Sequence, residues 1–543
     1  MGVFRKRMAS TSTSPKVFAR DATGFVKELG FLDHFLISQG IVLIINGFVA
    51  TVFFAPYLFP GANLYVDFAL GGIPALCMAF VYGRLSSGIA RSGGDYVWST
   101  RIAGPLYGTI QMVFVVSALV YYNIFNIWQM FTVAVGPTLF GIGAAQGSQS
   151  LISSGTSLSQ AGLGYPLSLL VLLAIVVIGL IGIRAYAWFC RVTVPIYLLV
   201  VVVFIATLLL LSTSTIQNSF DNAMKFAGVN ANYNGVIASA QSSGFSPTAF
   251  NLGNTLLAAI PWGFLTYVGF NWSSYSAGET KNAKSGIIGR AFGLSVILTM
   301  IVLEFLTYLI YSRFGAAFVN SVSYVAGANT SLFPVFPLPN FILTLANPTV
   351  GAIVAGALFI GWMINSAGLT VFSSRMLFAA SFDRILPTKL SDVSDRWHTP
   401  HFTVILMGAL SAVYLTLYWY AGGIAAILNT SIVVPIGLLL PLLAAFLFPL
   451  IKKDLYTRVY GSMKSAWLMA LAGIVGAGAF AIYAISETSP LVSGAYLGAN
   501  LALAWGVVAA LVLVGVAIYA LGRVRIKQIG IDPKAVFAEI PPE

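Results

Sequence analysis

Two of the long apolar stretches of this chain hold a glycine close to an asparagine, a pattern that can interrupt a helix. The first contains Ile45, Asn46 and Gly47 near its middle, and a later one reads Tyr267-Val268-Gly269-Phe270-Asn271. Glycine is a weak helix former, and irregular backbone is tolerated at membrane depth only where it lines a cavity or is buried in protein. We therefore expect both segments to contribute to a binding site. The alternative is that the glycines only allow helices to pack closely.

Other polar side chains lie in the apolar stretches. Tyr122 and Asn126 are one helical turn apart, so they share a face. We expect them to contact a bound solute, with hydrogen bonding between helices as the alternative. Asn365, Ser366 and Thr370 present oxygen atoms that suit a small cation.

Glu304 is the acidic residue that we place deep within an apolar stretch. A carboxyl group in the membrane is costly and is a functional candidate by default. One interpretation is that the Glu304 carboxyl group gains and loses a proton during proton-coupled transport. The alternatives are that it stays protonated and bonds to a neighbouring helix, or that it faces an outer vestibule.

The composition requires a bilayer around these elements. Of the 543 residues, 58% are hydrophobic and 8% charged, whereas a soluble domain carries about 25% charged residues. Twelve stretches are apolar over about the 20 residues that a spanning helix needs. They are 35–58, 64–90, 104–138, 164–183, 192–213, 254–276, 289–313, 347–379, 401–420, 423–448, 465–486 and 495–521.

The stretches divide the chain into an N-terminal segment (1–34), helices 1–5 (35–213), a long connection (214–253), helices 6–10 (254–448), helices 11 and 12 (449–521) and a tail (522–543). The connections 214–253 and 314–346 are not apolar enough to span, and we expect short surface helices in them.

Basic residues predict the orientation. With the N-terminus in the cytoplasm, all 28 Lys and Arg residues except Lys225 and Arg313 fall in inner segments. This is the positive-inside pattern, and it predicts a multi-pass protein of the cell membrane with both termini cytoplasmic. It also accounts for the net charge of +12 without a nucleic-acid partner, since the charges form no separate patch.

Three inner segments carry a family resemblance. Ile89-Ala90-Arg91-Ser92-Gly93-Gly94-Asp95-Tyr96-Val97-Trp98 follows the second stretch, Gly278-Glu279-Thr280-Lys281-Asn282-Ala283-Lys284 follows the sixth, and Ser373-Ser374-Arg375-Met376-Leu377-Phe378 ends the eighth. In this order, the chain resembles the amino acid–polyamine–organocation (APC) superfamily over roughly residues 30–525.

The resemblance implies an all-α membrane protein with a leucine-transporter-like fold. Helices 1–5 and 6–10 would form inverted repeats, and helices 11 and 12 would follow. Substrate would lie between interrupted helices 1 and 6, where half-helix N–H groups bind a carboxylate and free carbonyls an ammonium group. Leu265 falls where many relatives place an aromatic gate. The chain has Ile45-Asn46-Gly47 where the family often has a Gly-Ser-Gly-like stretch. In sodium-coupled relatives, helix 8 hydroxyls help to bind the ion.

These features predict a permease for amino acids, working by alternating access with H⁺ or Na⁺ coupling or exchange. Helices 1, 3, 6, 8 and 10 lack acidic residues, which favours neutral amino acids over amines that need a counter-charge. Cationic amino acids, polyamines or another small organic solute remain alternatives, because aromatic rings also hold cations. A channel and a non-transporting amino acid sensor are alternatives of another class.

A membrane enzyme would need several buried ionisable groups, which the sequence does not offer, so we expect no enzymatic activity. His34, His398 and His401 lack metal-ligand spacing. We expect neither a metal nor a cofactor, and the sequence does not predict an oligomeric state.

Overall fold

The computed structural model describes residues 24–328, 332–421, 432–488 and 501–538. Within these ranges the chain is helical and has no strand, apart from the isolated bridges Leu29–Thr280 and Ser92–Ser276. The first helices are α1 (Phe31–Val42), α2 (Ile44–Leu58), α3 (Leu64–Gly88), α4 (Asp95–Ile102), α5 (Pro105–Gln129), α6 (Gly136–Gln146), α7 (Gln149–Leu158), α8 (Ala161–Ile181), α9 (Ile183–Leu210), α10 (Thr213–Phe226), α11 (Tyr233–Ser242) and α12 (Leu252–Ala258). They are followed by α13 (Ile287–Ile310), α14 (Ala316–Ala328), α15 (Pro339–Ala346), α16 (Pro348–Phe382), α17 (His401–Tyr420), α19 (Val433–Ile451), α20 (Lys453–Tyr460), α21 (Ala466–Ser486), α23 (Leu501–Gln528) and α24 (Pro533–Ala538).

Eleven helical stretches among the described residues are long and apolar enough to cross a bilayer, which confirms an all-α, multi-pass protein. The predicted span 254–276 is not among them, because it is an irregular series of short helices. The predicted span 423–448 begins in residues outside the described ranges, and α19 is its described part. The total of twelve and the inverted repeat therefore stay predictions.

Some observed helix ends differ from the predicted ones, because a glycine starts a helix earlier or a π-helical turn joins two helices into one span. α9 begins at Ile183, nine residues before the predicted 192, because Gly182 turns the chain with φ of 103°. α5 continues through a π-helical turn at Met130–Val135 into α6, so the third span covers 42 residues. The connection 214–253 carries α10 and α11. In 314–346, α14 prolongs α13 through a second π-helical turn.

Small residues allow α3 to pack closely against its neighbours. A methyl group on Gly71 would lie 2.4 Å from the backbone of Gly263, and one on Gly83 would lie 2.4 Å from the Cα of Gly289. Close backbone contact of this kind supplies helix attraction in a bilayer, where lipid is as apolar as the side chains. It fixes α3 against α13 and against the irregular segment 254–276, which we call the sixth segment.

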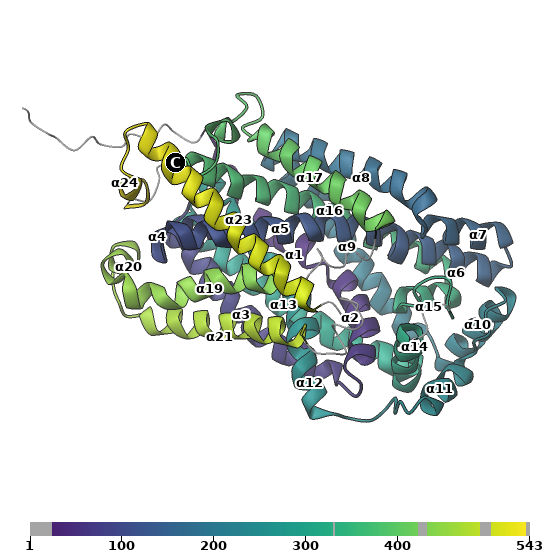
Figure 1. The fold of residues 1–543 in the computed structure, drawn as a ribbon. Helices are drawn as coiled ribbons and strands as arrows, with labels where there is room; N and C mark the ends of the chain where they lie inside the picture. The colour runs from purple at the N-terminus through teal and green to yellow at the C-terminus, as the bar shows by residue number, and fades with distance from the viewer. Residues whose placement is uncertain (1–23, 329–331, 422–431, 489–500, 539–543) are drawn as a thin grey trace, which may run out of the picture.

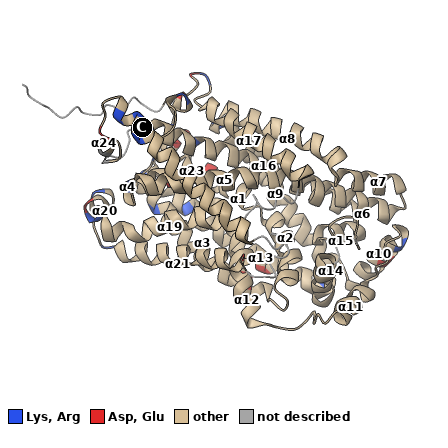
Figure 2. Ribbon diagram, in the orientation of Figure 1, with Lys and Arg blue, Asp and Glu red and all other residues tan. Residues whose placement is uncertain are grey.

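The outer surface of the bundle is apolar, as a lipid-facing surface must be. Leu199 on α9 is 62% exposed and Leu513 on α23 is 68% exposed, and α23 runs along the outside of the bundle (Figure 1). Charged residues gather toward one end of the molecule, near α20 and α24 (Figure 2). We call this the basic end. It also holds the connections that follow α3 and α16.

Candidate functional site

Helix 1 is interrupted at Leu43. The residue adopts a left-handed conformation with φ of 53°, and it ends α1 and begins α2. The predicted segment Ile45-Asn46-Gly47 is therefore not the break itself; it lies in the first turns of α2. The sequence placed the interruption two residues late because it followed glycine, whereas Leu43 takes up the turn.

The sixth segment is interrupted where the sequence predicted. After α12 come a π-helical turn at Ala259–Phe264 and a 3₁₀ turn at Leu265–Tyr267; Val268 is extended and Gly269 has φ of 124°. L-amino acids avoid this conformation. A methyl group on Gly269 would also lie 2.7 Å from the Cγ2 of Ile41. Glycine is thus required here by both backbone and packing.

The two interruptions lie against each other. The Thr51 and Thr266 hydroxyls are 2.9 Å apart, and the Ser38 hydroxyl donates to the carbonyl of Phe270 at 3.1 Å. A methyl group on Gly47 would lie 2.9 Å from the Thr266 side chain. One helix-breaking region is therefore assembled from segments more than 200 residues apart.

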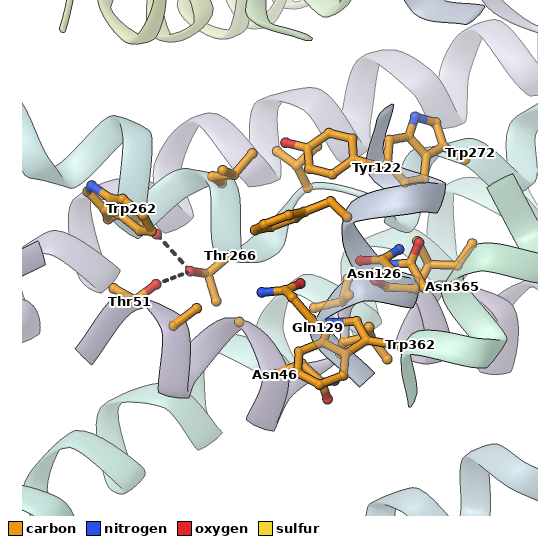
Figure 3. Close-up of a pocket in the computed structure, with 18 residues that line it drawn as sticks. Asn46, Thr51, Tyr122, Asn126, Gln129, Trp262, Thr266, Trp272, Trp362 and Asn365 are labelled. Carbon is orange, nitrogen blue, oxygen red and sulfur yellow. Dashed lines mark hydrogen bonds between the residues drawn. The ribbon is translucent and has the colours of Figure 1, made fainter. Parts of the chain in front are cut away.

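A cavity of about 150 Å³ opens at this junction (Figure 3). This is many times the ~10–15 Å³ that one water needs. Its walls come from helix 1, α5, the sixth segment and α16. They comprise Ile41, Val42, Leu43, Asn46, Gly47, Ala50, Thr51, Tyr122, Phe125, Asn126, Gln129, Trp262, Leu265, Thr266, Val268, Trp272, Trp362 and Asn365.

Three polar atoms of this wall are buried without a hydrogen-bond partner in the structure. They are Nδ2 of Asn126, Nε1 of Trp272 and Oδ1 of Asn365. Unsatisfied buried groups are costly, so they favour a polar ligand that completes them. Two donors and one acceptor match a carboxylate and an ammonium group. The lining includes no Asp, Glu, Lys or Arg.

Asn46 lies in the cavity wall, but its amide already serves to hold the break. It donates to the carbonyl of Leu358 at 3.0 Å and accepts from the Tyr197 hydroxyl at 3.0 Å. The same hydroxyl accepts the N–H of Ile45 at 2.8 Å, one of the first-turn amides that lack a partner within their helix. Asn46 therefore ties α2 to α9 and α16.

The structure brings six of the predicted substrate-contact residues to the cavity wall. They are Asn46, Gly47, Tyr122, Asn126, Leu265 and Val268. The wall does not include Ile45, Tyr267, Gly269 or Phe270. Tyr267 instead donates its hydroxyl to the carbonyl of Phe68 on α3 at 2.9 Å, so it holds the segment in place.

Sequence reasoning missed Gln129, Trp262, Trp272 and Trp362. Gln129 follows Asn126 by three residues and Trp362 precedes Asn365 by three, so helical spacing could have found both. Trp272 lies beyond the break, where no periodicity places it.

Of the ion-coupling candidates, only Asn365 lies in the cavity wall. Ser366 donates its hydroxyl to the carbonyl of Asn123 at 3.3 Å, and Thr370 accepts from the amide of Asn123 at 3.3 Å, so both face α5. Glu304 is half-buried on α13, within electrostatic reach of Tyr65 and Tyr267.

A second acidic residue is more deeply buried than Glu304, which corrects the sequence expectation. Asp67 on α3 is fully buried, and neither of its carboxyl oxygens has a hydrogen-bond partner. The first turn of α3 packs so closely on the sixth segment that a methyl group on Gly263 would lie 2.0 Å from the Asp67 carbonyl. This packing, which the sequence does not reveal, encloses Asp67.

Buried ion pairs lie between the cavity and the basic end. Arg375 on α16 contacts Glu279 at 2.9 and 3.2 Å, and both side chains are at most 1% exposed. Arg101 on α4 contacts Asp383 at the end of α16 at 2.8 Å. The first pair joins α16 to the connection after the sixth segment. It therefore ties that connection to the end of α16 nearer the basic end.

His34 and Asp95 bind residues at the C-terminal end of the sixth segment and just after it. The ring of His34 lies 3.1 Å from the Ser273 hydroxyl and 2.8 Å from that of Thr280. Asp95 accepts from the hydroxyls of Tyr275 at 2.6 Å and Tyr82 at 3.1 Å. Burial raises the pKa of Asp95 to about 7, against the opposing effect of these two hydrogen bonds.

Interrupted helices around an uncharged cavity with polar groups in its wall, within a multi-pass helical bundle, are the arrangement of binding sites in membrane transporters of the broken-helix class. The model of the amino acid permease family matches residues 29–517, so the chain belongs to this family of amino acid transporters in the APC superfamily. No curated protein matches the chain.

Proposed function

We propose that this permease is a secondary active transporter of neutral amino acids that works by alternating access. The observation that carries the proposal is the set of unpartnered groups in the cavity wall. Nδ2 of Asn126 and Nε1 of Trp272 would donate to the carboxylate, and Oδ1 of Asn365 would accept from the ammonium group. The wall is uncharged, so a charged side chain on the substrate would be buried there without a counter-ion. This favours neutral amino acids.

Buried contacts toward the basic end support the alternating-access part of the proposal. The inner halves of helix 1 and of the sixth segment lie between the cavity and the basic end, and the Glu279–Arg375 pair holds them to α16. These segments must separate from α16 before a solute can leave toward the basic end. The basic end faces the cytoplasm in this proposal, as the positive-inside rule requires.

Aromatic side chains favour one second candidate, a permease for cationic amino acids or polyamines. Tyr122, Phe125, Trp262, Trp272 and Trp362 all lie in the cavity wall, and aromatic faces attract ammonium groups. Competition by a panel of neutral, cationic and diamine solutes separates the two candidates.

The test is uptake of labelled neutral amino acids into proteoliposomes, with proton and sodium gradients imposed separately. Asn126→Leu removes a donor from the cavity. Gln111→Leu is its matched control, because Gln111 is another buried, unpartnered amide on α5 that does not line the cavity. We expect saturable uptake that falls at least ten-fold in Asn126→Leu and is retained in Gln111→Leu.

The same measurement identifies the driving ion, which the proposal leaves as H⁺, Na⁺ or exchange against internal amino acid. Asp67→Asn and Glu304→Gln test the two carboxyl candidates for proton coupling. Saturable binding without uptake or exchange would replace the transporter by a sensor. Non-saturating electrical flux would replace it by a channel.

A further inference from the structure

A second cavity, of about 520 Å³, lies at the basic end and is separate from the transport cavity. Three chain segments form its wall: the N-terminal segment at Lys27, the connection after α3 at Ala90 and Arg91, and residues 277–284 after the sixth segment. Four basic side chains line it, namely Lys27, Arg91, Lys281 and Lys284, and no acidic residue does.

The acidic residues next to this cavity face other partners. Glu28 binds Arg184 through both carboxyl oxygens, and Glu279 binds Arg375. The repulsion among Lys27, Lys281 and Lys284 is therefore not offset by an acidic residue of the cavity wall, and an anion would relieve it. Lysine and arginine around a concave surface, with Asn282 as a further hydrogen-bonding group, suit a phosphate group.

The position of the cavity selects among phosphate-bearing ligands. It lies where the spans α3 and α13 end and begin, which is the depth of lipid headgroups. Within five residues of Lys27 in the chain, the apolar side chains of Val26, Phe31 and Leu32 are 42%, 39% and 58% exposed. They offer a surface to acyl chains that a free anion would not use.

We propose that this cavity binds the phosphate headgroup of an anionic lipid in the leaflet at the basic end. Backbone hydrogen bonds join its three wall segments to one another. Glu28 N–H donates to the carbonyl of Glu279 at 2.8 Å, Lys281 N–H to that of Leu29 at 2.9 Å, and Gly93 N–H to that of Tyr275 at 2.9 Å. A bound headgroup joins these segments through their cations. It thereby stabilises the state closed at the basic end, a consequence that rests on the proposed transport cycle.

Binding is tested on the full chain purified in an uncharged detergent. The thermal midpoint is measured while water-soluble short-chain phosphatidylglycerol is added, with phosphatidylcholine of the same chain length as the uncharged reference. The test variant is Lys27→Gln/Lys281→Gln/Lys284→Gln. The control, Lys452→Gln/Lys453→Gln/Lys464→Gln, removes the same charge from exposed positions of another connection at the basic end.

A lysine near an anionic membrane surface contributes about a five-fold factor in binding. We therefore expect saturable stabilisation of the wild type and the control by phosphatidylglycerol alone, and at least a ten-fold higher half-saturating concentration for the test variant. Lys284→Glu, a single change at an exposed position, replaces the test variant if that variant does not fold.

Three results overturn the proposal. No stabilisation by phosphatidylglycerol removes the site, and an equal loss in the control shows that only net charge matters. Equal stabilisation by inorganic phosphate at the same concentration assigns the cavity to a free anion. All three readouts are of binding, so they hold even if the transport assay fails.

Discussion

If the proposed cycle is correct, the buried Glu279–Arg375 pair stabilises the state closed at the basic end, and removing it should favour the open state. Arg375→Met removes the guanidinium and leaves Glu279 buried without its ionic partner. Losing one member of a buried pair costs about 3–5 kcal/mol. If the pair exists only in the closed state, this cost falls on that state alone, and the equilibrium moves roughly 150- to 5,000-fold toward the state open at the basic end.

The reporter for this shift is a cysteine at position 38. Ser38 is fully buried on α1, between the cavity and the basic end. Ser38→Cys is placed in a chain whose native Cys77 and Cys190 are changed to serine and alanine. The rate of its modification by a membrane-impermeant thiol reagent, added on the basic side, measures opening. We expect Arg375→Met to raise this rate at least about 100-fold.

Asp383→Asn is the matched control, because it breaks the other buried pair at this end. That pair joins α4 to α16 and does not involve an interrupted helix. We expect it to lower the thermal midpoint without increasing modification at position 38. A folded Arg375→Met protein that reacts at the original rate would refute the reasoning, as would equal acceleration by Asp383→Asn.

Three further predictions concern the interruption, the cavity and the connection after α3. Gly269→Ala forces an L-residue to φ of 124° and against Ile41, so we expect at least ten-fold slower uptake in proteoliposomes that contain equal amounts of folded protein. Trp272→Phe removes the unpartnered indole N–H, and we expect the half-saturating substrate concentration to rise about ten-fold, the effect of one buried hydrogen bond to a charged group. Burial raises the Asp95 pKa from 3.8 to about 7, so the folded state holds a proton that the unfolded state releases between these values. Its stability should therefore fall as pH rises from 4 to 7 and then level off, and Asp95→Asn should lose less thermal stability than the wild type between pH 5 and pH 8.

The spans were predictable because their physical cause is local. A run of about 20 apolar residues has one stable environment, and the Gly269 interruption followed from the same local reading. The predicted span at 254–276 shows the limit, since it contains enough apolar residues but folds as short irregular turns. Its backbone is supported by distant groups, such as the Ser38 hydroxyl on the Phe270 carbonyl, which no window of sequence contains.

The cavity wall was less predictable for the same reason. Tyr267 was predicted to contact substrate because it is a polar aromatic residue beside the interruption. In the structure its hydroxyl donates to the carbonyl of Phe68 on α3 instead. Asp67 lies near the start of the predicted span 64–90, where a carboxyl group could reach water, yet its helix begins against the sixth segment, and its carboxyl group is enclosed. In both cases the direction of a side chain depends on which helix packs beside it.

The interruption of helix 1 is held from helices that are themselves continuous. Tyr197 on α9 accepts the N–H of Ile45, and Asn365 on α16 donates to the carbonyl of Ile41 at 2.8 Å. The backbone on both sides of the break is therefore hydrogen-bonded to continuous helices without a substrate. Oδ1 of the same Asn365 has no hydrogen-bond partner. A bound ammonium group would complete that amide. The substrate would then add to the contacts between α1 and α16. In the proposed cycle these two elements separate for release toward the basic end, so tight binding and release would oppose each other at this residue.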